Sequence, residues 1–501
     1  MTRSTTPIGP VHRPALLGND LGTSSVKAVV TDPHGAMIGQ AAGAYTVRTP
    51  RSAWSETDPR EWLSATAAAV RAAVAEAGAQ PLAVGFSGQM HGLVPTDAAG
   101  RPTRNAMLWS HARAVEQLTA YRRLPDRIRA RLANPLSPGM AGPMLGWLAE
   151  NEPDAYAAAR WVLQPKDWLR AQLTGRFATE PSDASATLLH NMPGDGWDAD
   201  VVDALGLDPA RLAPVLPSAA DPAGELRPEP AGMLDLPAGI PVAAGAADAA
   251  AAAVGTGLLD PGAVQLTIGT GAQIVRPVAT LPTALPPEPV THLYRAATDK
   301  GWYAMGAGLN AGSTLAWVCR NLGASWQQLY ATAVGEPGRD DPYFLPHLAG
   351  ERTPYLDSGT RGACTGLTPS RPGTPAAGRP RRGRVRRSRR PRGHPRSRES
   401  DAPPVFGRRR DNRSRMAPEA DVLAHPIRAL DVAAASRLGA ATLAARAAGL
   451  TDEATAVARP PTTDRHPGTG PDRPEIYRRR YCRYRELVTV IRQGRDHSPK
   501  T

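Results

Sequence analysis

The sequence predicts an α/β protein of two domains, and three observations lead to that prediction. At 501 residues the chain is too long for a single hydrophobic core, so two domains are the default. Short apolar runs of the kind found in strands alternate with longer stretches that have apolar residues at helical spacing. A pattern of strand, polar turn and strand near the N-terminus is repeated after residue 240, which places the boundary between the domains at 240–250.

The first strand pair is predicted between residues 16 and 30. Apolar runs at 16–17 and 26–30 flank the polar turn Gly-Thr-Ser-Ser at 22–25, as in a β-hairpin, and Asp20 ends the first strand. Such a turn offers backbone N–H groups and hydroxyls to an anion, with a carboxylate that can hold a cation beside it. This arrangement would suit a nucleotide phosphate with Mg²⁺, although Asp-x-Gly-Thr also occurs in ordinary hairpins.

A third strand is predicted at 36–40 and a helix at 59–77. The helix begins with a proline, which suits a first helical turn, and its apolar residues recur at helical spacing until a glycine ends it. A short buried strand at 82–86 then leads into the polar loop Ser-Gly-Gln-Met-His-Gly at 87–92. In an open α/β sheet, a loop of this kind at the end of a strand is where ligands bind. Further helices are predicted at 111–122, 125–133 and 143–158.

The repeat begins with a strand at 240–245 and an alanine-rich helix that opens at Asp248. Strands at 264–268 and 273–275 flank the turn Gly-Thr-Gly at 269–271, as in the first hairpin. On local grounds alone, Asp248 is an ordinary carboxylate at a helix N-terminus, where negative charge is favoured.

The positive charge of the chain is concentrated in one segment. The net charge is +13, but residues 371–415 hold 17 of the 59 Lys and Arg residues and only 3 of the 46 acidic ones, so the rest of the chain is nearly neutral. This segment has almost no large apolar side chains to offset the entropy of ordering, which predicts disorder. Its single aromatic residue, Phe406, leaves it without the stacking platforms of single-strand binders. We therefore expect salt-sensitive binding of polyanions but no specific nucleic-acid partner. Beyond it, helices are predicted at 436–448 and 475–491, with a proline-rich linker at 459–473.

The composition argues against a membrane protein and against a secreted one. No run of about 20 apolar residues is present, so no membrane-spanning helix is expected. The first 14 residues lack the apolar stretch of a signal peptide. The chain has 3 cysteines, which lie far apart in sequence and fit neither a disulfide framework nor a metal-binding pattern. We expect a cytoplasmic protein.

The order and content of five loops resemble the FGGY carbohydrate kinases, and within that family most closely the xylulokinases. These loops are Asp20–Lys27, Ser87–Gly92, Gly245–Asp248, Ile268–Gly271 and Gly350–Pro354. Shorter stretches that also match are Leu108–Arg113, Pro165–Asp167, Asp183–Ser185 and Tyr477–Tyr481. The Met-His pair of the second loop is the most specific feature, because in this family it contacts the pentulose. The resemblance covers residues 14–370 and returns for 421–488.

The resemblance implies an actin-like ATPase fold, in which two ribonuclease-H-like domains flank a catalytic cleft. It implies a sugar-binding N-terminal domain at 14–244 and an ATP-binding C-terminal domain at 245–488. The expected reaction is the phosphorylation of D-xylulose to D-xylulose 5-phosphate, with ATP and Mg²⁺. The expected partners are small molecules, the pentulose and ATP, and the family also allows a homodimer.

The resemblance further implies roles for individual residues. Asp248 matches the family's catalytic base, which takes the proton of the sugar hydroxyl as the γ-phosphoryl group arrives. The residues expected to bind the sugar are Gln89, Met90, His91, Trp109 and Asp248. Those expected at the ATP phosphates are Gly22, Thr23, Ser24, Gly269 and Thr270, with Asp20 as the anchor for Mg²⁺. Without the resemblance, His91 would be read as a satisfied core histidine and Met90 as a packing residue.

Three positions depart from the family pattern. His111 stands where many relatives carry Asp near the sugar, Ala249 follows the expected base where xylulokinases often have Asn, and Met144 occupies a position where the family often has Lys. These departures keep open a kinase for another ketopentose or a polyol, but none of them removes the expected base.

A larger departure follows Pro369. The family continues there with a helix and a Gly-Gly-Gly loop that holds the adenosine, whereas this chain has the Arg/Pro-rich segment 371–418. Our hypothesis is a pair of compensating frameshifts, because a GC-rich coding region read out of frame yields Arg, Pro, Gly, Ser and Ala. If the segment is genuine, we expect little or no kinase activity, and the chain could be a catalytically impaired sugar-binding remnant.

Overall fold

The structure of the chain is a computed structural model, and it forms two compact units. The described residues are 13–259, 261–298, 301–333, 341–357, 359–367, 405–408, 422–424, 426–430, 432, 434–450, 462–465 and 473–496. The first unit comprises Met1–Pro261, Pro277–Ala304 and Val432–Pro460, and the second comprises Gly262–Arg276, Met305–Asp431 and Pro461–Thr501. The predicted domain boundary at 244/245 stays a prediction, since these units are defined by packing and not by family membership.

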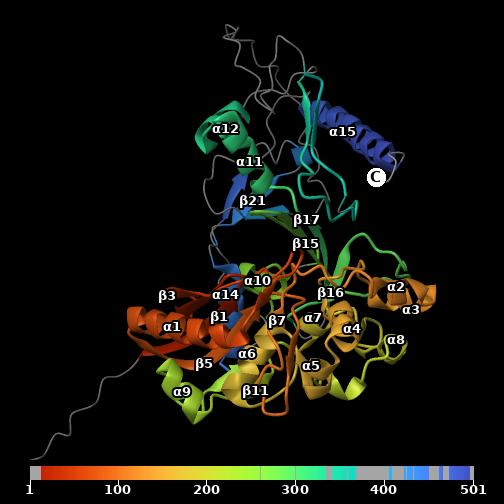
Figure 1. Cartoon of the computed structure of the whole chain (residues 1–501). Helices are drawn as coiled ribbons and strands as arrows, with labels where there is room; N and C mark the ends of the chain where they lie inside the picture. Colours follow the sequence, from red (N-terminus) through yellow and green to blue (C-terminus); the bar gives the residue numbers. More distant parts are fainter. Residues whose placement is uncertain are drawn as a thin grey trace, which may run out of the picture. The chain divides into compact units, whose positions relative to one another are not determined.

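The first unit is built on a mixed sheet with the strand order β11-β12-β5-β1-β2-β3 (Figure 1). Its strands are β1 (Arg13–Leu21), β2 (Ser25–Thr31), β3 (Met37–Ala44), β5 (Ala79–Gly88), β11 (Pro222–Glu225) and β12 (Pro241–Ala243). Strands β1, β2 and β3 form an antiparallel meander, which confirms the predicted hairpin, and Leu21 pairs with Val26 across its turn. Strand β5 lies parallel to β1, and β12 lies parallel to β5. The short strand β13 (Ala246–Ala247) adds to the end of β5.

The remaining elements of the first unit are shorter strands and the helices that surround the sheet. The strands are β4 (Glu56–Thr57), β6 (Val94–Thr96), β7 (Ala106–Met107), β8 (Trp161–Leu163), β9 (His190–Asn191), β10 (Gly196–Trp197) and β16 (His292–Arg295). The helices are α1 (Pro59–Ala77), α2 (Leu118–Arg123), α3 (Asp126–Leu132), α4 (Ala141–Asn151), α5 (Pro153–Ala158), α6 (Pro165–Thr174), α7 (Pro181–Ala184), α8 (Ala199–Ala204), α9 (Pro228–Leu234), α10 (Asp248–Thr256) and α14 (Ala435–Ala447), with a 3₁₀ turn at Pro209–Arg211. The predicted helix at 143–158 is two helices, α4 and α5, because Pro153 cannot continue the first of them.

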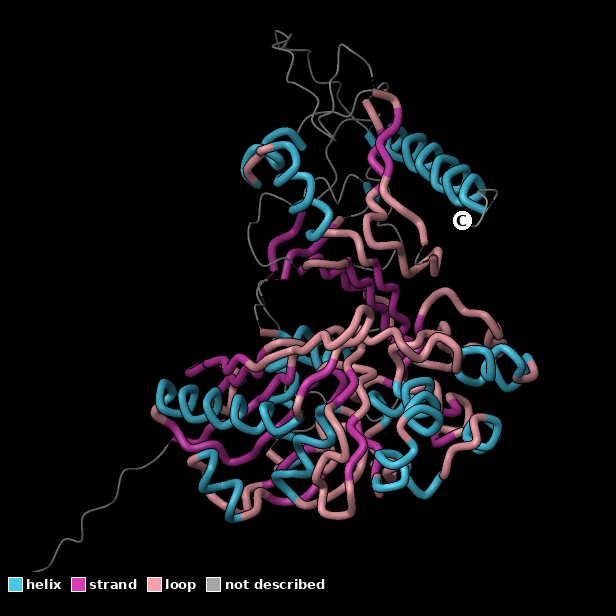
Figure 2. The backbone as a smooth tube through the Cα atoms, viewed as in Figure 1, coloured by secondary structure: helices cyan, strands magenta, loops and turns pink. Residues whose placement is uncertain are grey.

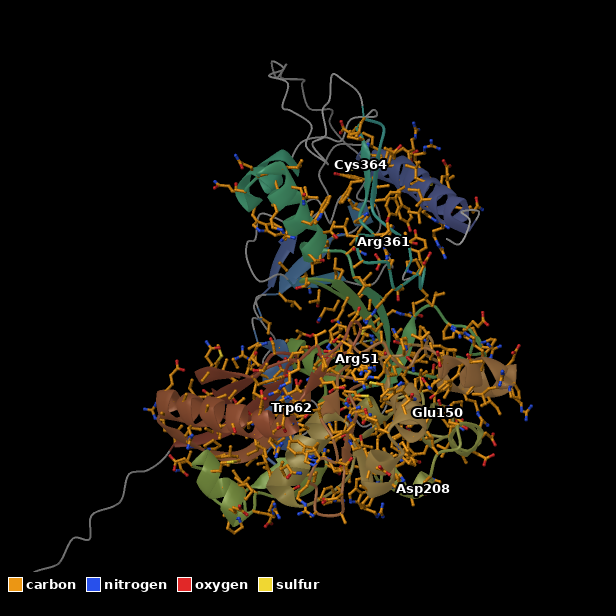
Figure 3. All side chains as sticks on the ribbon, viewed as in Figure 1. Arg51, Trp62, Glu150, Asp208, Arg361 and Cys364 are labelled. Carbon is orange, nitrogen blue, oxygen red and sulfur yellow. The ribbon has the colours of Figure 1, made fainter. Side chains whose placement is uncertain are left out.

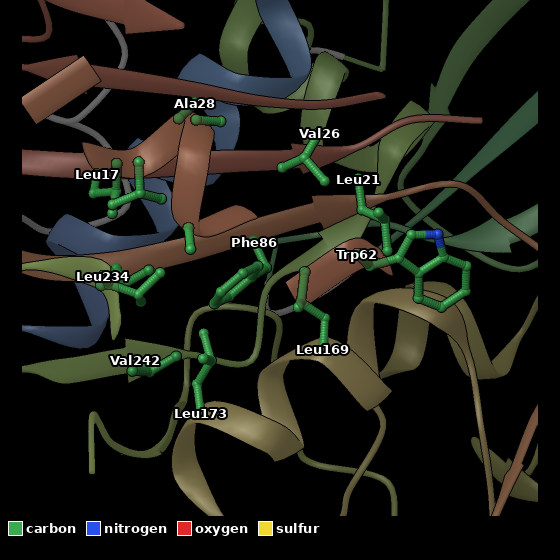
Figure 4. Packing of buried hydrophobic residues seen from close by; sticks show 14 of the residues in the cluster. Leu17, Leu21, Val26, Ala28, Trp62, Phe86, Leu169, Leu173, Leu234 and Val242 are labelled. Carbon is green, nitrogen blue, oxygen red and sulfur yellow. The ribbon is translucent and has the colours of Figure 1, made fainter. Parts of the chain in front are cut away.

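Helix α1 covers one face of the sheet, and its residues form the main apolar core with the strands. It matches the predicted range 59–77: Asp58 caps its N-terminus by accepting the N–H of Arg60, and Gly78 ends it in the left-handed conformation at φ 56°. Figure 4 shows the core, in which Leu17, Trp62 and Phe86 are fully buried. Trp62 is also labelled among the side chains of Figure 3.

Helix α14 packs on the opposite face, at two glycines that are register partners on neighbouring strands. A Cβ at Gly18 of β1 would lie 2.1 Å from the carbonyl oxygen of Arg437, and one at Gly85 of β5 would lie 1.9 Å from that of Ala440. The same helix meets α10 through another close approach, between Gly439 and Ala251. Small residues on both sides therefore let α14, which follows the basic segment in the sequence, complete the core of the first unit.

The second unit repeats the strand arrangement of the first. Its strands, drawn in magenta in Figure 2, run in the order β17-β15-β14-β20-β21-β22. The strands β20 and β21 lie parallel to β14 of the hairpin β14–β15. The strands are β14 (Val264–Ile268), β15 (Ala272–Val278), β17 (Trp302–Gly308), β18 (Tyr343–Leu345), β19 (Ala363–Thr365), β20 (Val405–Arg408), β21 (Ile427–Leu430) and β22 (Thr462–Arg465). The helices are α11 (Gly312–Leu322), α12 (Trp326–Ala333) and α15 (Arg473–Asp496). Each sheet is thus a hairpin with two further parallel strands beside its first strand. The repeated sequence pattern predicted the hairpins but not the parallel strands.

One prediction for the basic segment is wrong. Disorder was expected throughout 371–418, but Val405–Arg408 forms strand β20, paired on one side with β14 and on the other with β21. Two flanking strands satisfy its backbone N–H and C=O groups, so a short Val-Phe run suffices to form the strand. The rest of the segment lies outside the described residues. The linker predicted at 459–473 likewise contains a strand, β22.

Two absences hold for the described part of the chain. None of its helices is long and apolar enough to span a membrane. Its cysteines, Cys319, Cys364 and Cys482, form no disulfide.

Candidate active site

The ends of three neighbouring strands bring Asp20, Ser87 and Asp248 to one edge of the first sheet. Asp20 lies at the end of β1, opposite Ser87 of β5, and the Ser87 hydroxyl donates a hydrogen bond of 3.1 Å to its carboxylate. Strand β13 pairs with Ser87 and Gly88 and leads directly into α10, whose first residue is Asp248. Asp20 is buried, and Asp248 is mostly buried.

Asp248 has a pKa near neutrality. Burial, and next to it the negative charge of Asp20, raise the pKa of Asp248 to about 7, against the smaller opposing effects of the Ala249 N–H and of Lys27. Its side chain does not cap the helix, because the cap position is Ala247. A carboxylate with this pKa can accept a proton at neutral pH, as a general base must.

The polar loop after β5 places Gln89, Met90 and His91 beside this edge. The Gln89 side chain donates to the Tyr45 hydroxyl at 3.3 Å, and its Oε1 is buried with no hydrogen-bond partner among the described residues. Met90 is buried. His91 has a positive φ of 71°, which is costly for a residue other than glycine and is typical of functional sites.

His91 is oriented by its own hydrogen bond. Its Nδ1 lies 2.7 Å from the carbonyl oxygen of Ala186, so Nδ1 carries a proton and donates this hydrogen bond. The rings of His292 and Tyr294 lie beside it, with centroids at 6.5 and 5.9 Å. Such a histidine can accept a hydrogen bond from a hydroxyl.

The first turn, between β1 and β2, is held by a tryptophan. The Trp109 indole N–H donates to the Thr23 hydroxyl at 3.0 Å, and the Gly22 N–H donates to the carbonyl oxygens of Asp20 and Ser25. Ser24 is exposed at the tip of the turn. Trp109, expected at the sugar, and Thr23, expected at phosphate, are therefore direct neighbours in the first unit.

Gly269 and Thr270 form the corresponding turn of the second unit. The first residues of α11 approach it closely: the Gly312 N–H donates to the Gly269 carbonyl oxygen, and the Ser313 N–H donates to that of Thr270, both at 3.0 Å. A Cβ at Gly312 would lie 2.4 Å from the Gly269 oxygen, so glycine is required there. The turn is thus anchored at a helix N-terminus, whose dipole favours negative charge.

The Gly-Glu-Arg-Thr-Pro loop supports the same part of the second unit. Burial would raise the pKa of Glu351, but hydrogen bonds from His347, from the Leu309 N–H and from the Asn310 side chain lower it to about 2. The Tyr484 hydroxyl, on α15, bonds to His347 at 3.1 Å. Glu351 is therefore a fixed carboxylate that ties the start of α11 to this loop.

The departures from the family pattern are buried. His111 accepts the Ser55 N–H at 3.0 Å and contacts Arg113, and burial together with the charge of Arg113 lowers the pKa of His111 to about 4. A neutral histidine thus serves as an acceptor for the partners that a carboxylate could bind. Met144 is fully buried in α4, and Ala249 is buried in α10.

The stretches Pro165–Asp167 and Asp183–Ser185 match the family pattern, but the sequence did not predict that they belong to one buried group of charged residues. Its members, Lys166, Asp167, Arg170, Glu180 and Asp183, have fully buried side chains. The Lys166 ammonium lies 2.7 Å from Asp167, 3.4 Å from Glu180 and 3.2 Å from Asp183. The sequence signal was present, since Pro-Lys-Asp interrupts an apolar stretch, but its partners on the following turn could be assigned only from the fold.

The residues fit a magnesium ion that is bound mainly through a nucleotide. No group of three or more His, Cys, Asp or Glu side chains in the described segments could hold a metal. Mg²⁺ is commonly bound through one or two carboxylates together with substrate phosphates and water. Asp20 meets that requirement, and a cation bound there would offset the repulsion that raises the pKa of Asp248.

Comparison with known proteins agrees with this geometry. Residues 15–255 match the N-terminal domain of the FGGY family of carbohydrate kinases, and residues 264–378 match its C-terminal domain. The xylulose kinase of Escherichia coli (strain K12) is 34% identical over 355 residues, which are 70% of this chain and 72% of that protein. A glycerol kinase of Rhizorhabdus wittichii is 33% identical over 368 residues, 70% of this chain and 71% of that protein.

A solved structure extends the similarity to the fold of the whole chain. The crystal structure of a xyloylose kinase from Brucella ovis superposes with a TM-score of 0.82 and 30% identity, covering 96% of this chain and 99% of that one. These matches confirm the expected actin-like α/β fold and the expected class of enzyme. The chain therefore belongs to the FGGY family of carbohydrate kinases, as a sugar kinase that transfers a phosphoryl group.

Proposed function

We propose that the protein phosphorylates D-xylulose at O5 with ATP, and that Asp248 is the general base. The observation that carries this proposal is the pKa of about 7 that burial and Asp20 impose on Asp248. The sugar oxygen attacks the γ-phosphorus, the bond to the leaving ADP oxygen breaks, and the hydroxyl proton passes to the Asp248 carboxylate. Positioning and neutralisation of charge supply most of the remaining rate enhancement in such transfers.

The loop after β5 would bind the sugar. Nε2 of His91 accepts a hydroxyl, the Gln89 side chain provides a further polar contact, and Met90 with Trp109 lines the apolar side. The hydrogen bond that orients the His91 ring supports its role, and so does the Gln89 Oε1, which has no hydrogen-bond partner within the described segments. The relatives named xylulose kinase support a ketopentose as the substrate.

Each unit has a turn that would bind nucleotide phosphate. Thr23 and Ser24 would offer donors from the first turn and Thr270 from the second. Gly22 and Gly269, whose N–H groups donate within their own turns, would shape these turns. Asp20 would hold Mg²⁺, which when bound neutralises charge on the transferring phosphoryl group.

A titration calorimeter and an ADP-release assay on the full chain test the proposal together. We expect D-xylulose to bind more tightly than a second ketopentose and than glycerol, and ADP release to require D-xylulose. Tighter binding of glycerol would favour a polyol kinase instead. The relative named glycerol kinase is the reason to include glycerol in the comparison. Binding of D-xylulose without ADP release would identify the impaired remnant expected if segment 371–418 is genuine.

The Asp248→Asn variant tests the base in the same assays. Asparagine is nearly isosteric and cannot accept the proton, so we expect a fall in kcat of about 10²–10⁴-fold. Binding of D-xylulose should be retained in calorimetry, which separates loss of chemistry from loss of the site. An Asp248→Asn variant with undiminished ADP release would rule out Asp248 as the base.

A further inference from the structure

The buried ion cluster lies against two segments of the proposed site, the loop that carries His91 and the segment that precedes Asp248. Its members are Lys166, Asp167, Arg170, Glu180 and Asp183. A Cβ at Gly88, the residue before Gln89, would lie 2.7 Å from the Cβ of Lys166. A Cβ at Gly92, at the other end of the same loop, would lie 2.6 Å from Pro165. The first turn of α6 is therefore in direct contact with both ends of the loop that carries His91.

The same cluster holds the segment that precedes Asp248. The carbonyl oxygen of Ala244 accepts hydrogen bonds from Arg170 at 2.6 Å and from Lys166 at 3.4 Å. Two buried cations thus converge on one backbone carbonyl, four residues before the proposed base. Charge-assisted bonds of this kind are stronger and more directional than neutral ones.

A second connection runs through the turn at 180–187. Glu180 accepts hydrogen bonds from the backbone N–H and the hydroxyl of Ser182, both at 2.8 Å. The Ser182 hydroxyl oxygen in turn accepts the N–H of Ala247 at 2.9 Å, immediately before Asp248. Four residues further along the same turn, Ala186 provides the carbonyl oxygen that binds Nδ1 of His91. One short turn therefore holds the residue next to the base and the histidine of the sugar loop.

The charges of the cluster balance only if one carboxyl group is neutral. Burial would raise the pKa of Asp167, but the charges of Lys166 and Arg170 lower it. Burial raises the pKa of Asp183 well above its usual range, more than Lys166 lowers it. The cluster thus holds two cations and three carboxyl groups, of which Asp183 is the one whose charge burial disfavours most. Replacing buried ion pairs by apolar residues is often neutral or stabilising, so stability alone is a weak reason for such a cluster.

We propose that Lys166 and Ser182 are positioning residues, through which this cluster fixes Asp248 relative to His91. The proposal rests on the proposed function, because the role of Asp248 as base is part of it. Neither residue touches the reacting atoms. Each acts on the backbone that carries the base, Lys166 at Ala244 and Ser182 at Ala247.

The variant Ser182→Ala, in the full chain, tests the proposal with a minimal change. It removes the acceptor of the Ala247 N–H, whereas Lys166→Met would leave buried carboxylates unpaired and could prevent folding. Ser185→Ala is the matched control: it removes a hydroxyl of the same turn that accepts the Arg295 N–H and has no bond to the Asp248 segment. A thermal unfolding curve of each variant checks that it is folded.

Hydrogen exchange of the peptide 241–250 is the first readout, and it needs no activity. We expect its amides to exchange about tenfold faster in Ser182→Ala, the effect of losing one hydrogen bond, and to be unchanged in Ser185→Ala. The second readout is the pH dependence of D-xylulose affinity in calorimetry. The groups that face Asp248 are Asp20 from β1, Lys27 from β2 and Tyr303 from the part of β17 that belongs to the first unit, and all remain in both variants. If the loosened segment admits water to Asp248, the midpoint moves to lower pH in Ser182→Ala alone.

The outcomes separate the proposal from the function on which it rests. Unchanged exchange in Ser182→Ala overturns the proposal, and so does faster exchange with an unmoved pH midpoint, which would leave Ser182 a purely structural role. If the unaltered chain binds no D-xylulose, the proposed function fails. The exchange comparison then decides by itself whether the cluster holds the Asp248 segment.

Discussion

At the scale of single residues, Asp248 is held in a state that costs the folded protein stability. Its pKa rises from 3.8 to about 7 on folding, with burial as the main cause. Between these two values the folded state binds more protons than the unfolded state, so this group lowers the free energy of unfolding as pH rises from about 4 to 7. Catalytic acids and bases in enzymes often have pKa values that burial and neighbouring charges shift in this way.

We therefore predict that Asp248→Asn stabilises the first unit at neutral pH. Asparagine carries no charge to bury, so the Tm measured at pH 8 should rise by about 2–4 °C for each kcal/mol gained. At pH 5 the difference from the unaltered chain should shrink, because Asp248 is then protonated. Asp203→Asn, on an exposed position of α8, is the control. An equal change in Tm at both pH values would contradict the raised pKa of Asp248, because the cost of burying its charge should appear only where Asp248 is ionised.

At the scale of elements, helix α14 can pack against the sheet because two residues of the sheet have no side chain. Gly18 and Gly85 leave no side chain between the sheet and this helix, and the helix backbone fills the space. Behind them, Leu16 and Ala83 pack against Ala441, Ala444 and Ala445. Because the contacts are between backbones, the helix cannot adjust to a larger residue by changing a rotamer.

Gly85→Ala should consequently lower the Tm of the first unit. The added Cβ would meet the Ala440 carbonyl oxygen at 1.9 Å, and overpacking of this kind costs about 1–3 kcal/mol or more. Gly232→Ala is the control, since Gly232 lies in α9 with no atom near its Cβ position, and alanine favours a helix by about 1 kcal/mol. Circular dichroism melts of both variants check the prediction. A Gly85→Ala protein as stable as the Gly232→Ala one would refute the close packing of α14.

Sequence reasoning at this scale succeeded where the signals were local. The helix 59–77 carries its own cap, proline and terminal glycine, and it was predicted to the residue. The strand β20 was missed because its stabilisation comes from β14 and β21, which lie far from it in the chain. The linker at 459–473 concealed β22 for the same reason.

At the scale of the whole molecule, the first unit needs residues from beyond the basic segment. Val432–Pro460 belongs to this unit, and its helix α14 packs on β1, β5 and α10. A frameshift that was never corrected would therefore damage both units. The family-like sequence that resumes after residue 421 is therefore needed by the first unit as well as by the second.

Truncation tests this dependence. We predict that a chain ending at 421 loses the cooperative melting transition of the first unit, because the face of the sheet at Gly18 and Gly85 is left uncovered. A chain ending at 460 keeps α14 and should retain that transition, although it lacks β22 and α15 of the second unit. Calorimetric melts compare the two. Equal melting of both chains would show that α14 is dispensable.

The coding DNA tests the origin of segment 371–418. We expect another reading frame across codons 365–425 to encode a helix and a glycine-rich loop. A chain translated in that frame should release ADP with D-xylulose faster than the present chain. If no frame restores such a segment, the frameshift hypothesis fails and the basic segment is genuine. The match to the C-terminal domain of the family ends at 378, within the segment whose origin is in question.

The sequence by itself determined the repeated hairpins, the α/β class, the family and the identity of most of the proposed site residues. These features depend on short-range patterns and on motifs of contiguous residues, such as the Met-His pair at 90–91. Only the tertiary structure decided the pKa of Asp248, the ion cluster around Lys166 and the return of α14 to the first unit. Each of these arises from groups far apart in the chain, whose burial and proximity exist only once the sheets and helices have packed.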